Sequence, residues 1–140
     1  MQRGDSLLVL MWGAGAILCA QSTASVWDGV YTTAQSRGGS GLYAKDCASC
    51  HGEKLQGREQ APPLAGAEFI MKWADSSVGD LFDKMQTTMP ADQPGRLSAD
   101  QNAAILAYVL SANKFPAGAK ALPADGEKLR PIRFEAAKGN

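Results

Sequence analysis

Two cysteines and one histidine lie close together at Cys47-Ala48-Ser49-Cys50-His51. This spacing, with the histidine directly after the second cysteine, is the attachment signature of a c-type haem. Each thiol would add across one vinyl group of the porphyrin, and the two intervening residues let one turn of backbone reach both groups. The imidazole of His51 would then lie beneath the ring, where it can bind iron as a neutral ligand. The sequence therefore predicts one haem c, attached covalently through Cys47 and Cys50.

Two other kinds of site share part of this pattern. A thioredoxin-like dithiol also has two residues between its cysteines, but it needs a βαβ context, and no strand pattern appears near Cys47. A structural zinc site needs four ligands. The chain has 3 Cys and 1 His, and the third cysteine, Cys19, lies within the first twenty residues, so zinc would lack partners. Both alternatives are weaker than haem.

The residue on the other face of the iron would decide whether the haem carries electrons or binds ligands. The candidates are Met71, Met85 and Met89. A methionine at helical spacing more often fills the core than binds a metal, and this interpretation fits Met71 and Met85. Met89 lies instead in a loop beside Pro90, and it follows His51 by 38 residues (89 − 51), enough chain to pass round the ring edge. We therefore expect Met89 to be the sixth ligand.

Helices are expected to position these groups. A helix capped by Thr32 or Thr33 is predicted to run toward Asp46, through glycine-rich residues 38–41. Glycine is a poor helix former, so the alternative for 38–41 is a flexible loop.

The rest of the chain also has helical patterns. Further helices are predicted around 67–74, from a capping box at 77–80 through Met85 or Gln86, and from a second capping box at 98–101 to about Ala112. No convincing strand emerges, so the fold class is all-α: four or five helices around one haem.

Length and charge narrow the possibilities further. A chain of 140 residues suggests one domain. Its 14 basic and 14 acidic residues give no formal net charge, which argues for neither a nucleic acid nor an anionic membrane surface as a partner. Three cysteines form no disulfide framework.

The start of the chain has the pattern of a secretory signal peptide. Arg3 precedes an uncharged stretch at 7–20, and small and polar residues follow. The stretch is short for a membrane span, and we expect cleavage after Ala20 or Ala24. Asp5 offsets Arg3, so an uncleaved anchor facing the periplasm is the alternative, and only then would the protein meet a membrane. Haem c is attached outside the cytoplasm, so a periplasmic location agrees with the haem prediction.

The sequence thus predicts a signal peptide at 1–24, a helical domain at 25–114 and a tail at 115–140. The tail holds three prolines and three glycines, and we expect it to wrap over the core.

With these motifs in place, residues 37–112 resemble the class I c-type cytochromes, which are helical domains with a single haem. Three motifs match in the order of that family: C-x-x-C-H at 47–51, a proline-leucine pair at Pro63-Leu64, and the Met-Pro ligand loop at Met89-Pro90.

The resemblance implies further contacts. Pro63 and Leu64 would be cofactor-binding residues, with the Pro63 carbonyl accepting the proton on the far nitrogen of His51. Gly38 in the first helix would pack against Tyr108 in the last.

Three shorter matches point to a narrower group. The segments APPLAG (61–66) and TTMP (87–90) and the turn at 92–95 look most like monohaem cytochromes associated with quinoprotein (PQQ) alcohol dehydrogenases. Extra glycines at 39 and 41 and the proline-rich tail depart from the family pattern.

These observations predict an electron-transfer protein rather than an enzyme. With His51 and Met89 on the two faces of iron, the haem would carry one electron between a dehydrogenase, such as a quinoprotein, and the respiratory chain. The partners would be redox proteins, including a terminal oxidase or another cytochrome. The alternative is a haem enzyme or gas-binding protein in which Met89 is displaceable.

Overall fold

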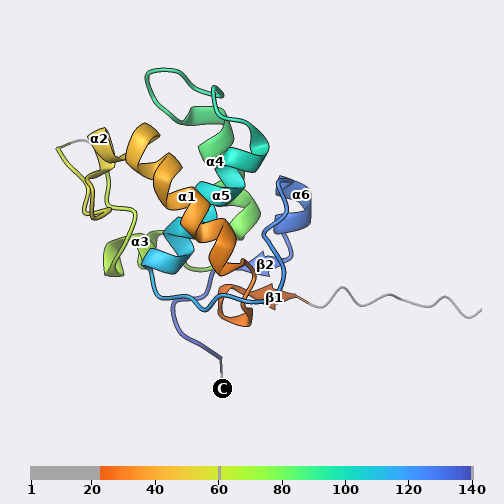
Figure 1. Cartoon of the computed structure of the whole chain (residues 1–140). Helices are drawn as coiled ribbons and strands as arrows, with labels where there is room; N and C mark the ends of the chain where they lie inside the picture. The colour runs from red at the N-terminus through yellow and green to blue at the C-terminus, as the bar shows by residue number, and fades with distance from the viewer. Residues whose placement is uncertain (1–22, 60, 140) are drawn as a thin grey trace, which may run out of the picture.

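The computed structural model describes residues 23–59 and 61–139. In this part of the chain the elements are β1 (Ala24–Ser25), the 3-10 helix η1 (Val26–Asp28), α1 (Thr33–Asp46), α2 (Ala48–His51), α3 (Ala67–Trp73), α4 (Val78–Thr88), α5 (Ala99–Ala112), α6 (Gly126–Leu129) and β2 (Ile132–Arg133) (Figure 1). The all-α prediction is confirmed. Six α-helices occur among the described residues where four or five were expected, because α2 and α6 are single turns of four residues each.

Two short strands were missed by the sequence analysis. β1 and β2 pair in parallel, with Ala24 opposite Ile132 and Ser25 opposite Arg133. Strands of two residues are too short to show an alternating pattern, so periodicity could not reveal them. The pair joins the two ends of the described chain (Figure 1).

The longest described helices, α1 and α5, form the centre of the molecule and pack on each other more extensively than any other pair in the described chain (Figure 1). Thr32, one of the two residues predicted as the cap, accepts a hydrogen bond from the Gln35 N–H and so caps α1. The glycine-rich residues 38–41 lie within this helix, so the loop alternative is wrong.

The expected glycine contact is one residue away from its predicted place. Gly38 has open space where a Cβ would stand, whereas Gly39 lies directly against the backbone of Ala104 and Ile105 in α5. Tyr108 packs instead on Tyr43, with ring centroids 5.3 Å apart. The pairing of Gly38 with Tyr108 is therefore wrong. The family pattern predicts that a glycine of this helix meets the partner helix. It does not say which of the three neighbouring glycines makes the contact.

Both predicted capping boxes are present. Ser77 and Asp80 open α4, and Ser98 and Gln101 open α5. In each box the serine hydroxyl accepts a hydrogen bond from the backbone N–H of the residue three positions later, and the side chain of that residue accepts one from the serine N–H. Two backbone donors at the start of the helix are thereby satisfied. α4 extends to Thr88, beyond the predicted end at Met85 or Gln86, and thus reaches the residue before Met89.

Residues 115–139 bury five large apolar side chains: Phe115, Leu122, Leu129, Ile132 and Phe134. The ring of Phe134 packs edge-on against Phe69 of α3 at 5.7 Å and against Phe115 at 5.3 Å. The tail therefore contributes directly to the same core as α3.

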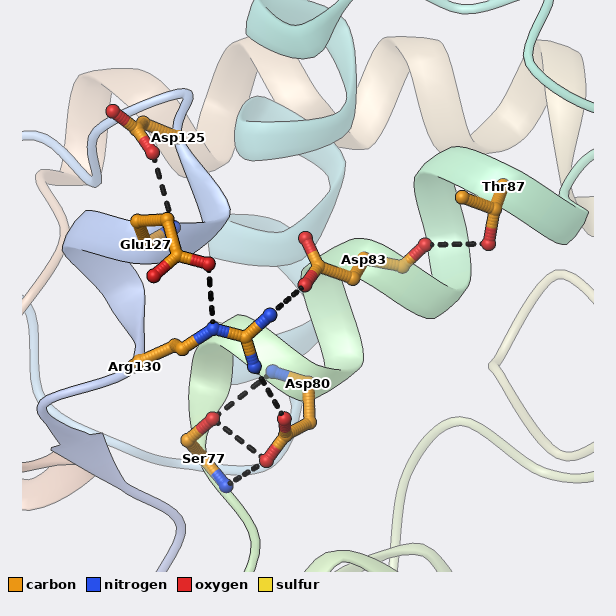
Figure 2. Close-up of polar contacts among 7 residues, drawn as sticks. All are labelled: Ser77, Asp80, Asp83, Thr87, Asp125, Glu127 and Arg130. Atoms are coloured by element: carbon orange, nitrogen blue, oxygen red, sulfur yellow. Dashed lines mark hydrogen bonds and ion pairs between the residues drawn. The ribbon is translucent and has the colours of Figure 1, made fainter.

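Arg130 ties the tail to α4 (Figure 2). Its guanidinium donates to Asp80 and Asp83 on α4, at 2.9 and 2.7 Å, and to Glu127 on α6 at 2.9 Å. These ion pairs lie at the surface, where each is worth little on its own. They mark the place where α6 meets α4.

The predicted signal peptide lies outside the described residues except for Thr23 and Ala24. Within 23–59 and 61–139, none of the helices combines the length and the apolar character needed to span a bilayer.

Candidate cofactor-binding site

A cavity of about 950 Å³ opens beside the Cys47–His51 segment. This volume falls at the upper end of the range usual for bound small molecules and cofactors, about 300–1,000 Å³. Its walls include every residue that the sequence analysis assigned to the cofactor: Cys47, Cys50, His51, Pro63, Leu64 and Met89. The structure therefore brings together side chains that are up to 42 residues apart in the chain (89 − 47).

The attachment segment is held by local hydrogen bonds. Cys47 is the C-cap of α1, and its carbonyl accepts bonds from the N–H groups of Cys50 at 3.2 Å and His51 at 2.9 Å. Cys50 and His51 thus lie on the single turn that follows Cys47, and both line the cavity. The buried hydroxyl of Tyr43 donates to the Gly52 carbonyl at 2.7 Å and secures the end of that turn.

Burial affects the acid–base properties of two groups here. Burial, with a smaller contribution from the charge of Asp46, raises the pKa of the Cys47 thiol to about 11. Burial also raises the pKa of Tyr43, so its phenol stays neutral and acts as a donor. At Cys47, burial thus favours the neutral thiol over the thiolate.

His51 is oriented by a backbone carbonyl. Its Nδ1 lies 2.8 Å from the carbonyl oxygen of Pro62. Because a carbonyl can only accept, Nδ1 carries the proton, and in the neutral imidazole Nε2 keeps a lone pair for a metal. Such a bond to the distal ring nitrogen fixes both the tautomer and the ring orientation of a ligand histidine.

The acceptor was assigned to the wrong proline. The resemblance implied Pro63, but the bond goes to Pro62. Two adjacent prolines give the same motif in either register, so the sequence could not distinguish them. Pro63 and Leu64 line the cavity as neighbours of this carbonyl.

Asn113 holds the Pro62–Leu64 loop in place and was not recognised as part of the site. Its buried side-chain amide donates to the Leu64 carbonyl at 2.9 Å and accepts from the Gly66 N–H at 3.0 Å. In the sequence Asn113 reads only as a helix end, which gave no signal of this second role.

The three methionines differ in position. Met85 and Met89 both line the cavity, and Met85 also packs against the core. Met71 is 75% exposed, so the expectation that it fills the core is wrong. The helix α3 has only seven residues, and its buried face is formed by Phe69, so Met71 points away.

Met89 stands at the C-cap of α4. Its N–H donates to the Met85 carbonyl at 3.0 Å, and its own carbonyl accepts from the Gly95 N–H at 3.3 Å. The backbone on both sides of Met89 is thus fixed, with the side chain at the cavity wall.

Further wall residues were not predicted as site residues. They come from the apolar faces of α3, α4 and α5 and from the rim: Phe69, Trp73, Leu81, Ile105, Val109, Asn102, Asp46 and Arg96. Helical spacing marked several of them as buried, but could not say that they face a cavity rather than another helix.

This set of groups fits a haem. The cavity is large and mostly apolar, two free thiols and an oriented imidazole lie on one wall, and thioether side chains lie on the same cavity. Attachment of the porphyrin through cysteine thioethers, imidazole ligation of the iron and a hydrophobic surround are features by which proteins hold haem c and tune its iron.

Comparison with known proteins agrees with this geometry. A family model described as "Cytochrome C oxidase, cbb3-type, subunit III" matches residues 34–109, which is more than half of the chain. The search of curated proteins found no match.

Among solved structures, the crystal structure of the sulfane dehydrogenase SoxCD from Paracoccus pantotrophus is similar, with a TM-score of 0.51 and 24% sequence identity. The match covers 82% of this chain and 62% of that chain. At this identity the likeness concerns the fold.

The chain is therefore a c-type cytochrome domain with covalently bound haem c, and Cys47 and Cys50 have the spacing that this attachment requires. The family-model match ends at 109, so Asn113 and the tail lie outside the matched region.

Proposed function

The chain belongs to the family of cbb3-type cytochrome c oxidase subunit III domains, and we propose that it is an exported one-electron carrier with His51 and Met89 as axial ligands. When bound, haem c supplies a one-electron Fe(III)/Fe(II) couple. The residues of the chain hold it, exclude water from it and set its potential.

One observation carries this proposal: the two thiols, the Nδ1-protonated imidazole and the Met89 side chain all line a single cavity. Methionine is a soft ligand that favours reduced iron and raises the potential. Met89 is preferred over Met85 because its backbone leaves the end of α4 for a loop, whereas Met85 lies within α4 and packs against the core.

A carrier needs little rearrangement when its charge changes. The covalent link, the bond between His51 and Pro62, and the anchored loop of Asn113 all keep the cavity wall fixed. Two protein ligands would also block the site to exogenous molecules, which separates a carrier from a gas-binding protein or a peroxidase-like enzyme.

We propose the periplasm as the location, since the pattern at 1–24 is that of a signal peptide. A dehydrogenase would be the donor, in particular a quinoprotein, on the strength of the segments at 61–66 and 87–90. A terminal oxidase or another cytochrome would be the acceptor.

The ligand assignment is tested by comparing Met89→Ala with Met85→Ala in the holoprotein. Met89→Ala should abolish the weak far-red band of ferric methionine-ligated haem, lower the potential and allow the reduced protein to bind carbon monoxide. Met85→Ala should keep the spectrum and lose about 2 kcal/mol of stability, because it truncates a packed side chain. The reverse pattern would assign the ligand to Met85, and rapid carbon monoxide binding by the unmodified protein would contradict the carrier function.

The partner is tested separately. The exported holoprotein, used as bait on periplasmic extract, should recover a dehydrogenase that reduces it in the presence of that enzyme's own substrate. Recovery of dehydrogenases that all fail to reduce the haem would contradict the proposed donor.

A further inference from the structure

An ion pair crosses the rim of the cavity between Asp46 and Arg96. Arg96 Nη2 donates to Asp46 Oδ1 at 2.8 Å. The Asp46 side chain is only 5% exposed, whereas that of Arg96 is 39% exposed. Both residues line the cavity.

The two partners belong to the two segments that would hold the haem from opposite sides. Asp46 is the last residue of α1 and directly precedes Cys47. Arg96 lies near the end of the loop that follows Met89, and its N–H donates to the Gln93 carbonyl within that loop at 3.2 Å. The positions of Asp46 and Arg96 are therefore coupled to those of Cys47 and Met89.

Within the described residues, this is the one hydrogen-bonded link between 43–52 and 88–97. The other hydrogen bonds of the Met89 loop are internal, such as those from Gln93 to Pro90 and from Gly95 to Met89, or join it to the neighbouring helices, as those from Met89 to Met85 and from Asn102 to Leu97 do. These bonds shape the loop but do not fix it to the attachment segment.

We propose that Asp46 and Arg96 form a latch that holds the Met89 loop against the haem-attachment segment, so that both are positioning residues for the sixth ligand. This inference rests on the proposed ligation by Met89. With the latch closed, the methionine stays over the iron. With it open, the loop moves and the sixth position becomes accessible.

The burial of Asp46 is what makes this pair different from an ordinary surface ion pair. Exposed pairs contribute little because water solvates both charges when they separate. When the arginine moves away, a carboxylate that water hardly reaches has no other group to stabilise its charge. The free energy of leaving that charge unpaired keeps the ion pair closed. The Arg130 pairs, with Asp80 and Asp83 on α4 and Glu127 on α6, are a natural comparison, because their carboxylates are 43 to 80% exposed.

The experiment measures the rate at which the reduced holoprotein binds carbon monoxide, together with the far-red band of the ferric form. Arg96→Leu and Asp46→Asn should each raise that rate about tenfold or more, which corresponds to about 1.4 kcal/mol or more lost from the closed loop. Arg96→Lys should restore most of the closure. Arg130→Gln, which breaks exposed pairs on α4, should behave like the unmodified protein.

Potential measurements separate the latch from a simple effect of charge. Arg96→Leu leaves an uncompensated negative charge near the haem and Asp46→Asn a positive one, so a charge effect shifts the potential in opposite directions. The double variant Asp46→Asn/Arg96→Leu cancels the charge but keeps the latch broken. A double variant with the carbon monoxide rate of the unmodified protein would overturn the proposal.

Met89→Ala distinguishes failure of the latch from failure of the ligand assignment. If Met89→Ala leaves the spectrum unchanged, the ligation itself is wrong and the latch falls with it. If Met89→Ala abolishes the far-red band while the Asp46 and Arg96 variants bind carbon monoxide no faster than Arg130→Gln, the ligation holds and the latch is refuted.

Discussion

Gly39 of α1 lies so close to Ala104 of α5 that a Cβ at position 39 would overlap the Ala104 carbonyl oxygen. Glycine here lets two helix backbones meet directly. One residue earlier, Gly38 has no atom within 4 Å of the place where its Cβ would stand. Adjacent glycines of one helix are thus under opposite constraints.

Substitution of these two glycines by alanine should therefore change stability in opposite directions. Gly39→Ala should destabilise the holoprotein by about 1–3 kcal/mol, because α1 and α5 must separate to admit the methyl group. Gly38→Ala should stabilise it by about 0.5–1 kcal/mol, because alanine loses less conformational entropy in a helix. Urea unfolding followed by the haem absorbance measures both. Equal effects at the two positions would contradict the close contact.

The difference between Gly38 and Gly39 shows how far sequence reasoning reached. Local chemistry was predictable: the attachment motif, the serine capping boxes and the methionine loop each depend on a few adjacent residues. Which of two neighbours faces a partner was not predictable, because it depends on how α1 is rotated against α5 for Gly38 and Gly39, and on the path of the loop for Pro62 and Pro63. Contacts between distant segments, such as Asp46 with Arg96, leave no local pattern at all.

Asn113 should matter more than its place at a helix end suggests. Asn113→Ala would leave the Leu64 carbonyl and the Gly66 N–H without their partner. We expect a loss of about 1–3 kcal/mol, the usual cost of unpaired buried polar groups. Ser111→Ala, a half-buried neighbour on the same turn, should cost less than about 0.5 kcal/mol. The urea midpoints of unfolding of the two variants test this expectation. Equal midpoints would mean that other contacts hold the Pro62–Leu64 loop.

Asp80 should make part of the free energy of unfolding depend on pH. Hydrogen bonds from the backbone N–H and the hydroxyl of Ser77, at 2.9 and 2.7 Å, hold the pKa of Asp80 below its usual 3.8, and Arg130 adds to this effect. Since the folded pKa is the lower one, the contribution is present above about pH 4 and disappears as the pH falls through the folded value.

Unfolding free energies at about pH 6 and about pH 3 would test this linkage. Asp80→Asn should cost about 0.5–1 kcal/mol at the higher pH, as loss of an exposed capping interaction does, and less at the lower pH. Asp100→Asn is the matched control, since Asp100 occupies the first turn of α5 and its side chain makes no hydrogen bond among the described residues. A cost for Asp80→Asn that is the same at both pH values would show that its charge is not involved.

The C-terminal tail should unfold together with the haem domain, although it lies beyond the region that the family model matches. Phe134 is fully buried between Phe69, which lines the cofactor cavity, and Phe115. Phe134→Ala should therefore destabilise the whole protein by about 3–5 kcal/mol. Tryptophan fluorescence and haem absorbance should report the same shifted transition, because a cooperative domain unfolds as one unit.

Lys120→Ala, at an exposed position of the same tail, should change stability by less than about 0.5 kcal/mol. Two separate transitions in Phe134→Ala would instead mean that the tail folds independently of the cavity wall.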